Sequence, residues 1–313
     1  MFRAFGTALL GLAMACSTAE GQDYPSQTIK LIVPFLAGGP VDALSRVVAQ
    51  QLQNRLGQNV IVENRSGGGT TIGAKAVASA PPDGYTLLVI GPNIAYYPVL
   101  FPDLDFDATK ALTRVATLVT WSHVIAVAPT VPANSVPELV SHAKANPGTL
   151  AFGFGLATMP HIVGVTFKQA AGIDIIDVPY RGGEQARADL LGGRVHINIA
   201  PLPQLLPLIR DGKIRAVAYT GPDLPDVATM TESGYPQVGF NPDVWMGILA
   251  PAGTPTAIVD KLNREVNAVL KSEEMAPALK RFGYEAKITT PAEFEVFFAA
   301  ELRKWPPILK ATA

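Results

Sequence analysis

The sequence TIKLIVPFLAGGPVDALSRVVAQQLQNRL, from Thr28 to Leu56, predicts a strand, a glycine loop and a helix in succession. Ile29 to Val33 is a short apolar run, and apolar residues then recur every three or four positions until Gly57, which is the spacing of an amphipathic helix. The pair Gly38-Gly39 lies in the predicted loop between the strand and the helix. We therefore expect unpaired backbone N–H groups and the positive end of the helix dipole to face one small space. A carboxylate would fit there.

Strand, loop and helix return along the chain. Asn59 to Ala80 reads as a second such unit, and Tyr85 to Ile90 as a third strand. The later part of the chain repeats this order in three segments, which are Thr149 to Gly172, Asp174 to Gly193 and His196 to Ile199. The duplication predicts an α/β fold of two βαβαβ halves, each a mostly parallel sheet flanked by helices. The glycine loops should lie at the carboxyl ends of the strands, which is where ligands bind in such sheets. Two facing halves make a cleft.

Two extended segments are candidate crossovers between the halves. One is VATLVTWSHVIAVA, residues 115–128, and the other is VWMGILA, residues 244–250. The tail after them is helical in pattern, so it should return to the first half. We therefore predict a discontinuous first domain of residues 24–122 and 246–313 and a second domain of residues 123–245. The two crossovers should act as hinges.

The composition bounds the class of protein. The chain has 313 residues, 48% hydrophobic and 16% charged, which is typical of a globular protein large enough for two domains. Its 25 basic and 26 acidic residues give a net charge of -1. Such a balance provides no field to attract nucleic acid or an anionic membrane.

The N-terminal segment resembles a secretory signal. It has one early cation, Arg3, an apolar run, and small residues at positions suited to signal peptidase. Cleavage before Glu20 would make residues 1–19 the signal peptide and remove the only cysteine, Cys16, so that the mature chain could form no disulfide. Cys16 also follows an imperfect lipoprotein box, which leaves a lipid anchor as the alternative. We expect an exported, periplasmic protein.

The common catalytic and cofactor motifs are absent. The sequence contains no G-x-S-x-G, Walker loop, H-E-x-x-H or C-x-x-C pattern, and its four histidines are scattered. Gly153-Phe154-Gly155 begins a dinucleotide-binding pattern, but Thr158 stands where a third glycine would be. We accordingly predict no catalytic residue, no metal site and no cofactor.

Several side chains near the glycine loops are candidate ligand contacts. His161 starts the helix of the second glycine unit, where its imidazole could donate to a carboxylate or bond a nearby carbonyl instead. Arg181, at the end of a strand, faces either the cleft or solvent. The phenylalanines that flank the loops either touch ligand or fill the core. Asp42, in the first turn of its helix, is explained by the helix dipole alone.

With these residues placed, the chain resembles the Bug family, the periplasmic solute receptors of tripartite tricarboxylate transporters. The resemblance runs from about Tyr24 to the C-terminus. It rests on IKLIVPFLAGGPVD from Ile29, VENRSGGGTTIGAKAVASAPPDGYTLL from Val62 and VPYRGGEQARADLLGGRV from Val178. It implies a two-domain Venus-flytrap fold that holds a small organic carboxylate between the glycine loops of the two domains, largely by backbone groups and water.

The sequence departs from the family pattern in two places. A serine- and glycine-rich run is replaced by Phe154 to His161 (FGLATMPH), and Ala200 stands where an aspartate is usual. Because hydroxyls give way to apolar side chains, we predict a carboxylate with an apolar or aromatic body. The predicted ligand-binding residues are Phe35, Ala37, Gly38, Gly39, Asn93, Phe152, Phe154, Gly155, Thr158, His161, Tyr180, Arg181 and Pro201.

The function implied is that of a monomeric periplasmic receptor that delivers its ligand to membrane permease subunits. An orphan receptor that presents its ligand to a sensor kinase is the alternative within binding proteins. An enzyme, a hydrolase or isomerase using His161 and Arg181, is the alternative of another class.

Overall fold

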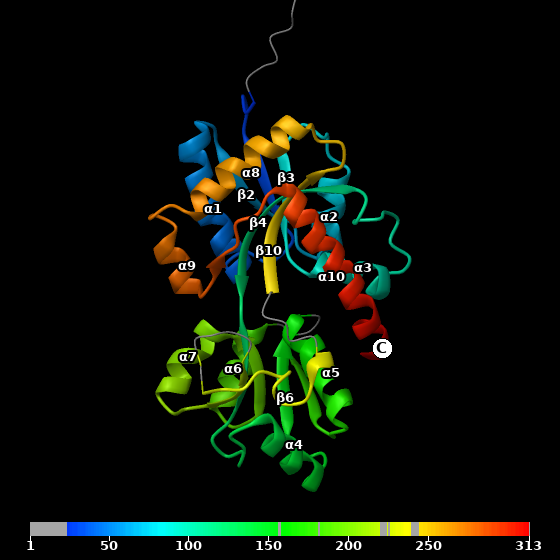
Figure 1. Ribbon diagram of the computed structural model, residues 1–313, viewed down its shortest axis with the longest axis vertical. Helices are drawn as coiled ribbons and strands as arrows, with labels where there is room; N and C mark the ends of the chain where they lie inside the picture. Colours follow the sequence, from blue (N-terminus) through cyan, green and yellow to red (C-terminus); the bar gives the residue numbers. More distant parts are fainter. Residues whose placement is uncertain are drawn as a thin grey trace, which may run out of the picture.

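The computed structural model describes residues 24–155, 158–180, 182–219, 224, 226–238 and 244–312. The described strands form two sheets, each with its own helices, drawn one above the other in Figure 1. The signal peptide and Cys16 lie outside the described residues. Among the residues described, no helix combines the length and apolar character that a membrane crossing needs.

The upper sheet has six strands in the order β11-β4-β10-β3-β1-β2. Its strands are β1 (Ile29–Val33), β2 (Val60–Asn64), β3 (Thr86–Ile90), β4 (Leu112–Trp121), β10 (Val244–Pro251) and β11 (Glu285–Ala286). Its helices are α1 (Pro40–Leu56), α2 (Thr71–Ala78), α3 (Asn93–Leu100), α8 (Thr256–Leu270), α9 (Ala276–Phe282) and α10 (Pro291–Thr312), with a short 3-10 turn at Gly68–Thr70.

Helices cover both faces of this sheet because its strands are apolar on both sides. In β1, Leu31 and Val33 pack with α1 and α8 on one face, while Ile32 packs with α2, α3 and α10 on the other. A strand buried on both faces has a nearly continuous apolar sequence, and IKLIV is apolar except for the exposed Lys30 near its start. The carboxyl end of β1 and the start of α1 face the lower unit.

The lower sheet has five strands in the order β7-β6-β8-β5-β9. Its strands are β5 (His123–Val127), β6 (Ala151–Gly155), β7 (Ile176–Tyr180), β8 (Ile197–Pro201) and β9 (Arg215–Tyr219). Its helices are α4 (Val136–Ala145), α5 (Met159–Ala171), α6 (Gly183–Leu191) and α7 (Leu202–Arg210), with a 3-10 turn at Pro236–Val238.

The two sheets repeat one topology, as the duplication in the sequence predicts. The order β2-β1-β3 followed by the antiparallel β10 and then β4 matches β7-β6-β8 followed by the antiparallel β5 and then β9. Each sheet is mixed, with parallel βαβ pairs, and most strands of each sheet run in one direction, as predicted, with β10, β11 and β5 opposed to them. Each crossover strand runs back from the opposite unit and therefore enters its sheet antiparallel.

The chain passes between the sheets where β4 continues into β5 and again before β10, as expected from the two extended segments. Strand β10 begins at Val244, two residues before the boundary drawn from the sequence. The domain boundaries themselves stay a prediction, as does the hinge motion about the crossovers.

A third link between the units is formed by packing. Helix α10 reaches past its own sheet to contact α5 of the lower unit (Figure 1). The contact is a buried cluster of Ala95, Tyr96, Ile162, Trp305 and Leu309.

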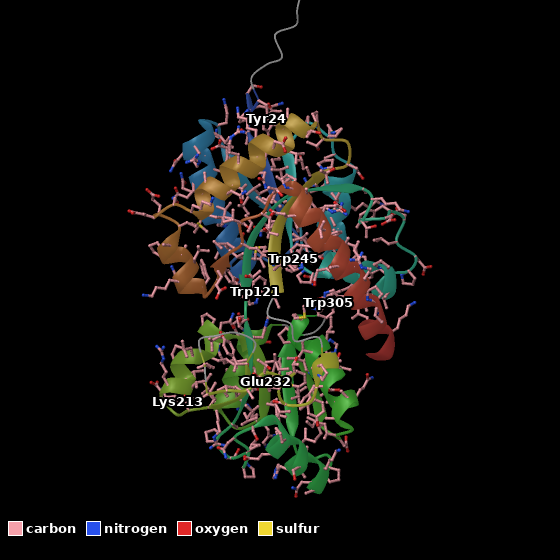
Figure 2. The ribbon with its side chains drawn as sticks, in the orientation of Figure 1. Tyr24, Trp121, Lys213, Glu232, Trp245 and Trp305 are labelled. Carbon is pink, nitrogen blue, oxygen red and sulfur yellow. The ribbon has the colours of Figure 1, made fainter. Side chains whose placement is uncertain are left out.

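The chain's three tryptophans all lie near this junction (Figure 2). The Trp245 and Trp305 indole nitrogens both donate to Oε2 of buried Glu301, at 3.0 and 2.8 Å. Because Trp245 is the second residue of β10 and Trp305 belongs to the cluster between the units, Glu301 connects a crossover strand to the packed contact between the units.

Candidate functional site

The glycine loop of the upper unit connects β1 to α1. Gly38 has a left-handed backbone with φ of 83°, while Gly39 is extended with φ of −75° and forms the N-cap of α1 without a side-chain cap from the described residues. Pro40 follows at the first helical position, where a missing N–H costs no hydrogen bond. The N-cap residue of α1 therefore supplies no side-chain acceptor to the first turn of the helix.

One loop donor is already engaged. Gly38 N–H donates to Oδ2 of Asp42 at 2.9 Å, so the expectation that the loop presents only unpaired donors is wrong at Gly38. Gly39 N–H meets no acceptor among the described residues. Ala37 and Gly38 are exposed, and Phe35 and Gly39 are half-buried. The loop thus keeps a free amide at the positive end of the helix dipole.

The corresponding loop of the lower unit connects β6 to α5. Phe152 and Phe154 are 2% and 3% exposed and belong to the core of the lower sheet. Gly155 is buried, and Thr158 donates its hydroxyl to Gly155 O at 2.6 Å. The two phenylalanine rings therefore present little surface to a ligand in this structure.

His161 lies in the first turn of α5 and stacks on Phe154, with ring centroids 4.3 Å apart and planes 11° from parallel. Burial lowers the pKa of His161, Asp177 opposes this and Lys168 adds to it. The imidazole is therefore neutral near pH 7, so it can offer one N–H donor and one acceptor. The alternative in which it bonds a nearby carbonyl has no support among the described residues, because no such bond is found.

The remaining predicted residues are dispersed. Tyr180 donates its hydroxyl to Asp189 at 2.6 Å, and burial together with Asp189 raises its pKa to about 12. Pro201 ends β8 opposite His123 of β5. Asn93 starts α3 and is half-buried. Arg181 lies outside the described residues.

A cavity of about 410 Å³ lies between the two units beside the N-terminus of α1. Of the predicted residues it brings together Gly38 and Gly39. The rest of its lining comes from α1, α6, α7, α9 and the segment after α9, and comprises Pro40, Ala43, Val47, Glu184, Pro203, Gln204, Arg281, Phe282 and Tyr284. The cavity therefore depends on both units for its walls.

Four of the residues that line the cavity have charged or polar side chains, namely Glu184, Gln204, Arg281 and Tyr284. Arg281 pairs with no carboxylate in the described part of the chain, and its guanidinium carbon lies 5.6 Å from the Phe282 ring centroid. Gln204 accepts from Arg187 at 2.8 Å. Tyr284 is buried, which raises its pKa, and its ring lies 5.1 Å from that of Trp121 at the end of β4.

The cavity residues from α7 and α9 were not predicted from the sequence. The duplication in the sequence places the end of β8 at the cleft, and on this basis Pro201 was predicted to contact the ligand. Gln204, one helical turn later in α7, was not predicted. Nothing local marks Arg281 or Tyr284, because their place in the cavity depends on the tail returning to the edge of the upper sheet. No group of three histidine, cysteine or acidic side chains suited to a metal ion occurs in the described residues.

Two α/β units joined by crossover strands, with a cavity between them, define a two-domain binding protein. The chain belongs to the tripartite tricarboxylate transporter family receptors, whose family model matches residues 44–313. The resemblance to the Bug family is thereby confirmed. The family and its solved relatives are periplasmic solute-binding proteins rather than enzymes.

Individual relatives cover nearly the whole chain. BugT of Bordetella pertussis is 34% identical, over 97% of this chain and 96% of its own length. An R. palustris protein solved with adipate is 33% identical, with a TM-score of 0.80, over 93% of this chain and 98% of its own. MatC from Rhodopseudomonas palustris, solved with bound malate, is 28% identical, with a TM-score of 0.77, over 91% and 99% of the two chains.

Proposed function

We propose that this receptor is exported to the periplasm, captures a small organic carboxylate between its two units and delivers it to membrane permease subunits. The observation that carries the proposal is the cavity that opens on the uncapped N-terminus of α1 and takes its walls from both units. Relatives solved with adipate and malate support a carboxylate as the ligand. The family description supports a tripartite transporter as the destination.

The helix N-terminus supplies only part of the binding free energy. An anion there gains about 0.3–1 kcal/mol, or up to about 2 kcal/mol when partly buried. A micromolar ligand needs about 8 kcal/mol. Most of the remainder must come from the cavity walls, where apolar surface contributes about 25 cal/mol per Å² of ligand area removed from water.

We still propose a ligand with an apolar body. The residues that would contact this body, however, differ from those predicted from the sequence. Phe154 is in the core and Leu156 lies outside the described residues. Apolar wall comes instead from Ala43, Val47 and Phe282. With one carboxylate on the Gly39 amide, a medium-length acid would lie along this wall.

The far end of the ligand has a candidate partner in Arg281. Arg281 lines the cavity, and its guanidinium lacks a carboxylate partner among the described residues. Arg281 favours a second acid group over a purely apolar tail, since a guanidinium pairs well with a carboxylate. An adipate-like diacid with an apolar spacer therefore fits the cavity better than a compact, hydroxyl-rich acid.

A binding screen tests this proposal. The protein is first stripped of carried ligand by unfolding and refolding, then screened by thermal shift with adipate, medium-chain monoacids, benzoate, malate and citrate. A ligand at one hundred times its Kd stabilises the protein by about 2.7 kcal/mol. We expect adipate and medium-chain acids to bind more tightly than malate and citrate in follow-up calorimetry. The reverse order would refute the apolar body, and no binding of any acid would refute the carboxylate receptor.

A further inference from the structure

Asp42 is a buried acid placed where a ligand anion is expected to bind. It is the third residue of α1 and 3% exposed. A carboxylate in the first helical turn is stabilised by the helix dipole. The dipole alone, however, does not require burial or several hydrogen-bond donors. The surroundings of Asp42 therefore call for a more specific explanation.

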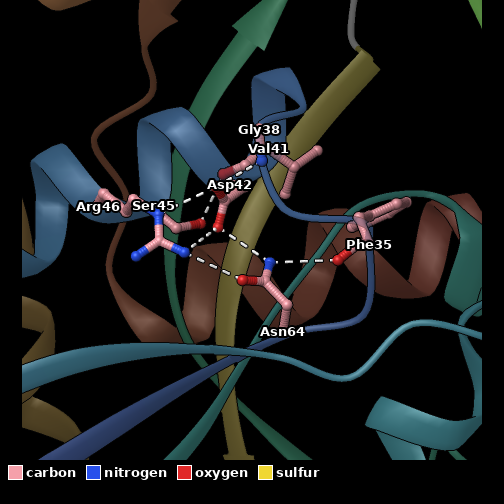
Figure 3. A network of polar contacts seen from close by, with 7 residues as sticks. All are labelled: Phe35, Gly38, Val41, Asp42, Ser45, Arg46 and Asn64. Atoms are coloured by element: carbon pink, nitrogen blue, oxygen red, sulfur yellow. Dashed lines mark hydrogen bonds and ion pairs between the residues drawn. The ribbon is translucent and has the colours of Figure 1, made fainter.

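The carboxylate of Asp42 is held by three different elements, which Figure 3 shows together. The loop contributes Gly38 N–H at 2.9 Å, and helix α1 contributes Arg46 Nε at 3.0 Å. The end of β2 contributes Asn64 Nδ2 at 2.9 Å. Burial raises the pKa of Asp42, but these donors and the charge of Arg46 lower it by more, so the net pKa lies below its usual range.

Asn64 extends the network to the other end of the loop. Its Nδ2 also donates to Phe35 O at 3.2 Å, and its Oδ1 accepts from Arg46 Nη2 at 3.0 Å. The register of the sheet explains this position, because Asn64 pairs with Val33, the last residue of β1. Phe35 and Gly38, near the two ends of the six-residue loop between β1 and α1, are thus each bonded by a side chain outside the loop (Figure 3).

Beyond Phe35, which packs against the core of the upper unit, the loop contains little that would fix its shape. Leu36 is 75% exposed, and Ala37 and Gly38 are exposed as well. Gly38 is in a left-handed conformation that other backbone states of glycine could replace at small cost. Order in this loop therefore depends on the bonds to Asp42 and Asn64.

We propose that Asp42, held by Arg46 and Asn64, is a positioning residue that fixes the glycine loop so that the Gly39 amide points at the ligand carboxylate. This inference rests on the proposed function of the cleft. Fixing a binding loop before the ligand arrives removes the entropy cost of ordering it on binding. Arg46 balances the charge of Asp42, so the ligand does not meet a bare like charge.

A purely electrostatic role of Asp42 would change ligand affinity in the opposite direction from a positioning role. If Asp42 acted on the ligand only through its charge, removal of that charge would tighten binding of an anion, because like charges repel. If Asp42 positions the loop, its removal weakens binding. The substitution Asp42→Asn preserves size and removes the charge, so it separates the two effects.

The experiment measures adipate binding by calorimetry and the hydrogen exchange of the Gly38 amide by NMR. For Asp42→Asn we expect adipate binding to weaken by at least about tenfold and Gly38 exchange to accelerate by at least about tenfold. Asn64→Ala, which keeps Asp42 in place, should move both readouts in the same direction. Glu138→Gln is the matched control, since Glu138 is also in the first turn of a helix, bonds a backbone N–H nearby and lies outside the cavity.

The outcomes are distinct. Equal or tighter adipate binding by Asp42→Asn, or unchanged Gly38 exchange in both variants, would overturn the positioning role. A wild-type protein that binds no adipate would count against the proposed ligand, while the exchange measurement would still decide whether Asp42 orders the loop. If Asp42→Asn fails to fold, Asn64→Ala decides by the same two readouts.

A double substitution adds a readout that general destabilisation does not move. Asp42→Asn and Asn64→Ala act through one loop, so together they should weaken adipate binding little more than the larger single effect. Multiplication of the two single effects in the double variant would contradict a shared role in positioning.

Discussion

Gly283 is the point where adding one methyl group should force the two units apart. It ends α9 with a left-handed backbone, φ of 63°, and a Cβ built on it would lie 1.4 Å from Cγ of Pro203 in α7 of the lower unit. Carbon atoms in contact stay about 3.5 Å apart, so Gly283→Ala requires a displacement of about 2 Å. Pro203 is a rigid ring that lines the cavity, and its helix would have to move with it.

The expected magnitude has two parts. A left-handed backbone costs a non-glycine residue about 1–2 kcal/mol, whether the units touch or not. Overpacking adds about 1–3 kcal/mol, but only to the form in which α9 and α7 are in contact. If ligand binding requires that form, this second part weakens binding roughly 5- to 140-fold, since about 1.4 kcal/mol is tenfold.

Gly57 offers a matched control. It ends α1 in the same left-handed conformation, φ of 66°, and a Cβ there would meet nothing within 4 Å. Urea unfolding should show the backbone cost in both alanine variants. X-ray scattering and adipate calorimetry should show a larger radius of gyration and weaker binding only for Gly283→Ala. If both variants match in radius and affinity, contact between α9 and α7 has no part in closure.

Three further substitutions test separate parts of the structure. Gly39→Val should weaken carboxylate binding strongly with little loss of stability, because Gly39 is extended and its Cβ meets only Leu36 O at 3.5 Å; normal binding by a folded variant would exclude the loop as the site. Glu301→Leu should lower the free energy of unfolding, measured in urea, by about 2–6 kcal/mol, because two buried indole N–H groups lose their acceptor. Glu301→Gln keeps an acceptor and should lower the free energy of unfolding much less. Equal losses in the two variants would contradict this explanation. Burial lowers the pKa of His123 to about 3, so the unfolded chain binds this proton first as pH falls. The stability that neutral His123 contributes is therefore complete above about pH 6.5 and declines progressively toward pH 3, and urea titrations of His123→Asn should show a shallower decline.

The repeated strand, loop and helix order was predictable because it depends on local patterns. The apolar run of β1, the periodic apolar face of α1 and the stop at Gly57 are each set within a few residues. The duplication then placed the glycine loops at one edge of each sheet. The direction of the crossover strands was not predictable in this way, since it depends on how β5 and β10 return from the opposite unit.

Side-chain direction at the loops was the weaker part of the sequence prediction. Phe154 follows a glycine in an apparent ligand loop, yet it is a core residue because β6 is buried on both faces. Asp42 was adequately explained by the helix dipole, and only the structure reveals its bonds to Gly38 and Asn64. Arg281 reaches the cavity through the tail, at a sequence distance that no local pattern spans.

The most direct test of the central claim is a crystal structure of the stripped and refolded protein saturated with adipate. We expect one adipate carboxylate within hydrogen-bonding distance, about 2.7–3.2 Å, of the Gly39 amide at the start of α1. The ligand should contact both units at once, with its spacer against Val47 and Phe282 and its far end toward Arg281. A bound adipate that touches one unit only, or that lies away from the Gly38-Gly39 loop, would contradict the account.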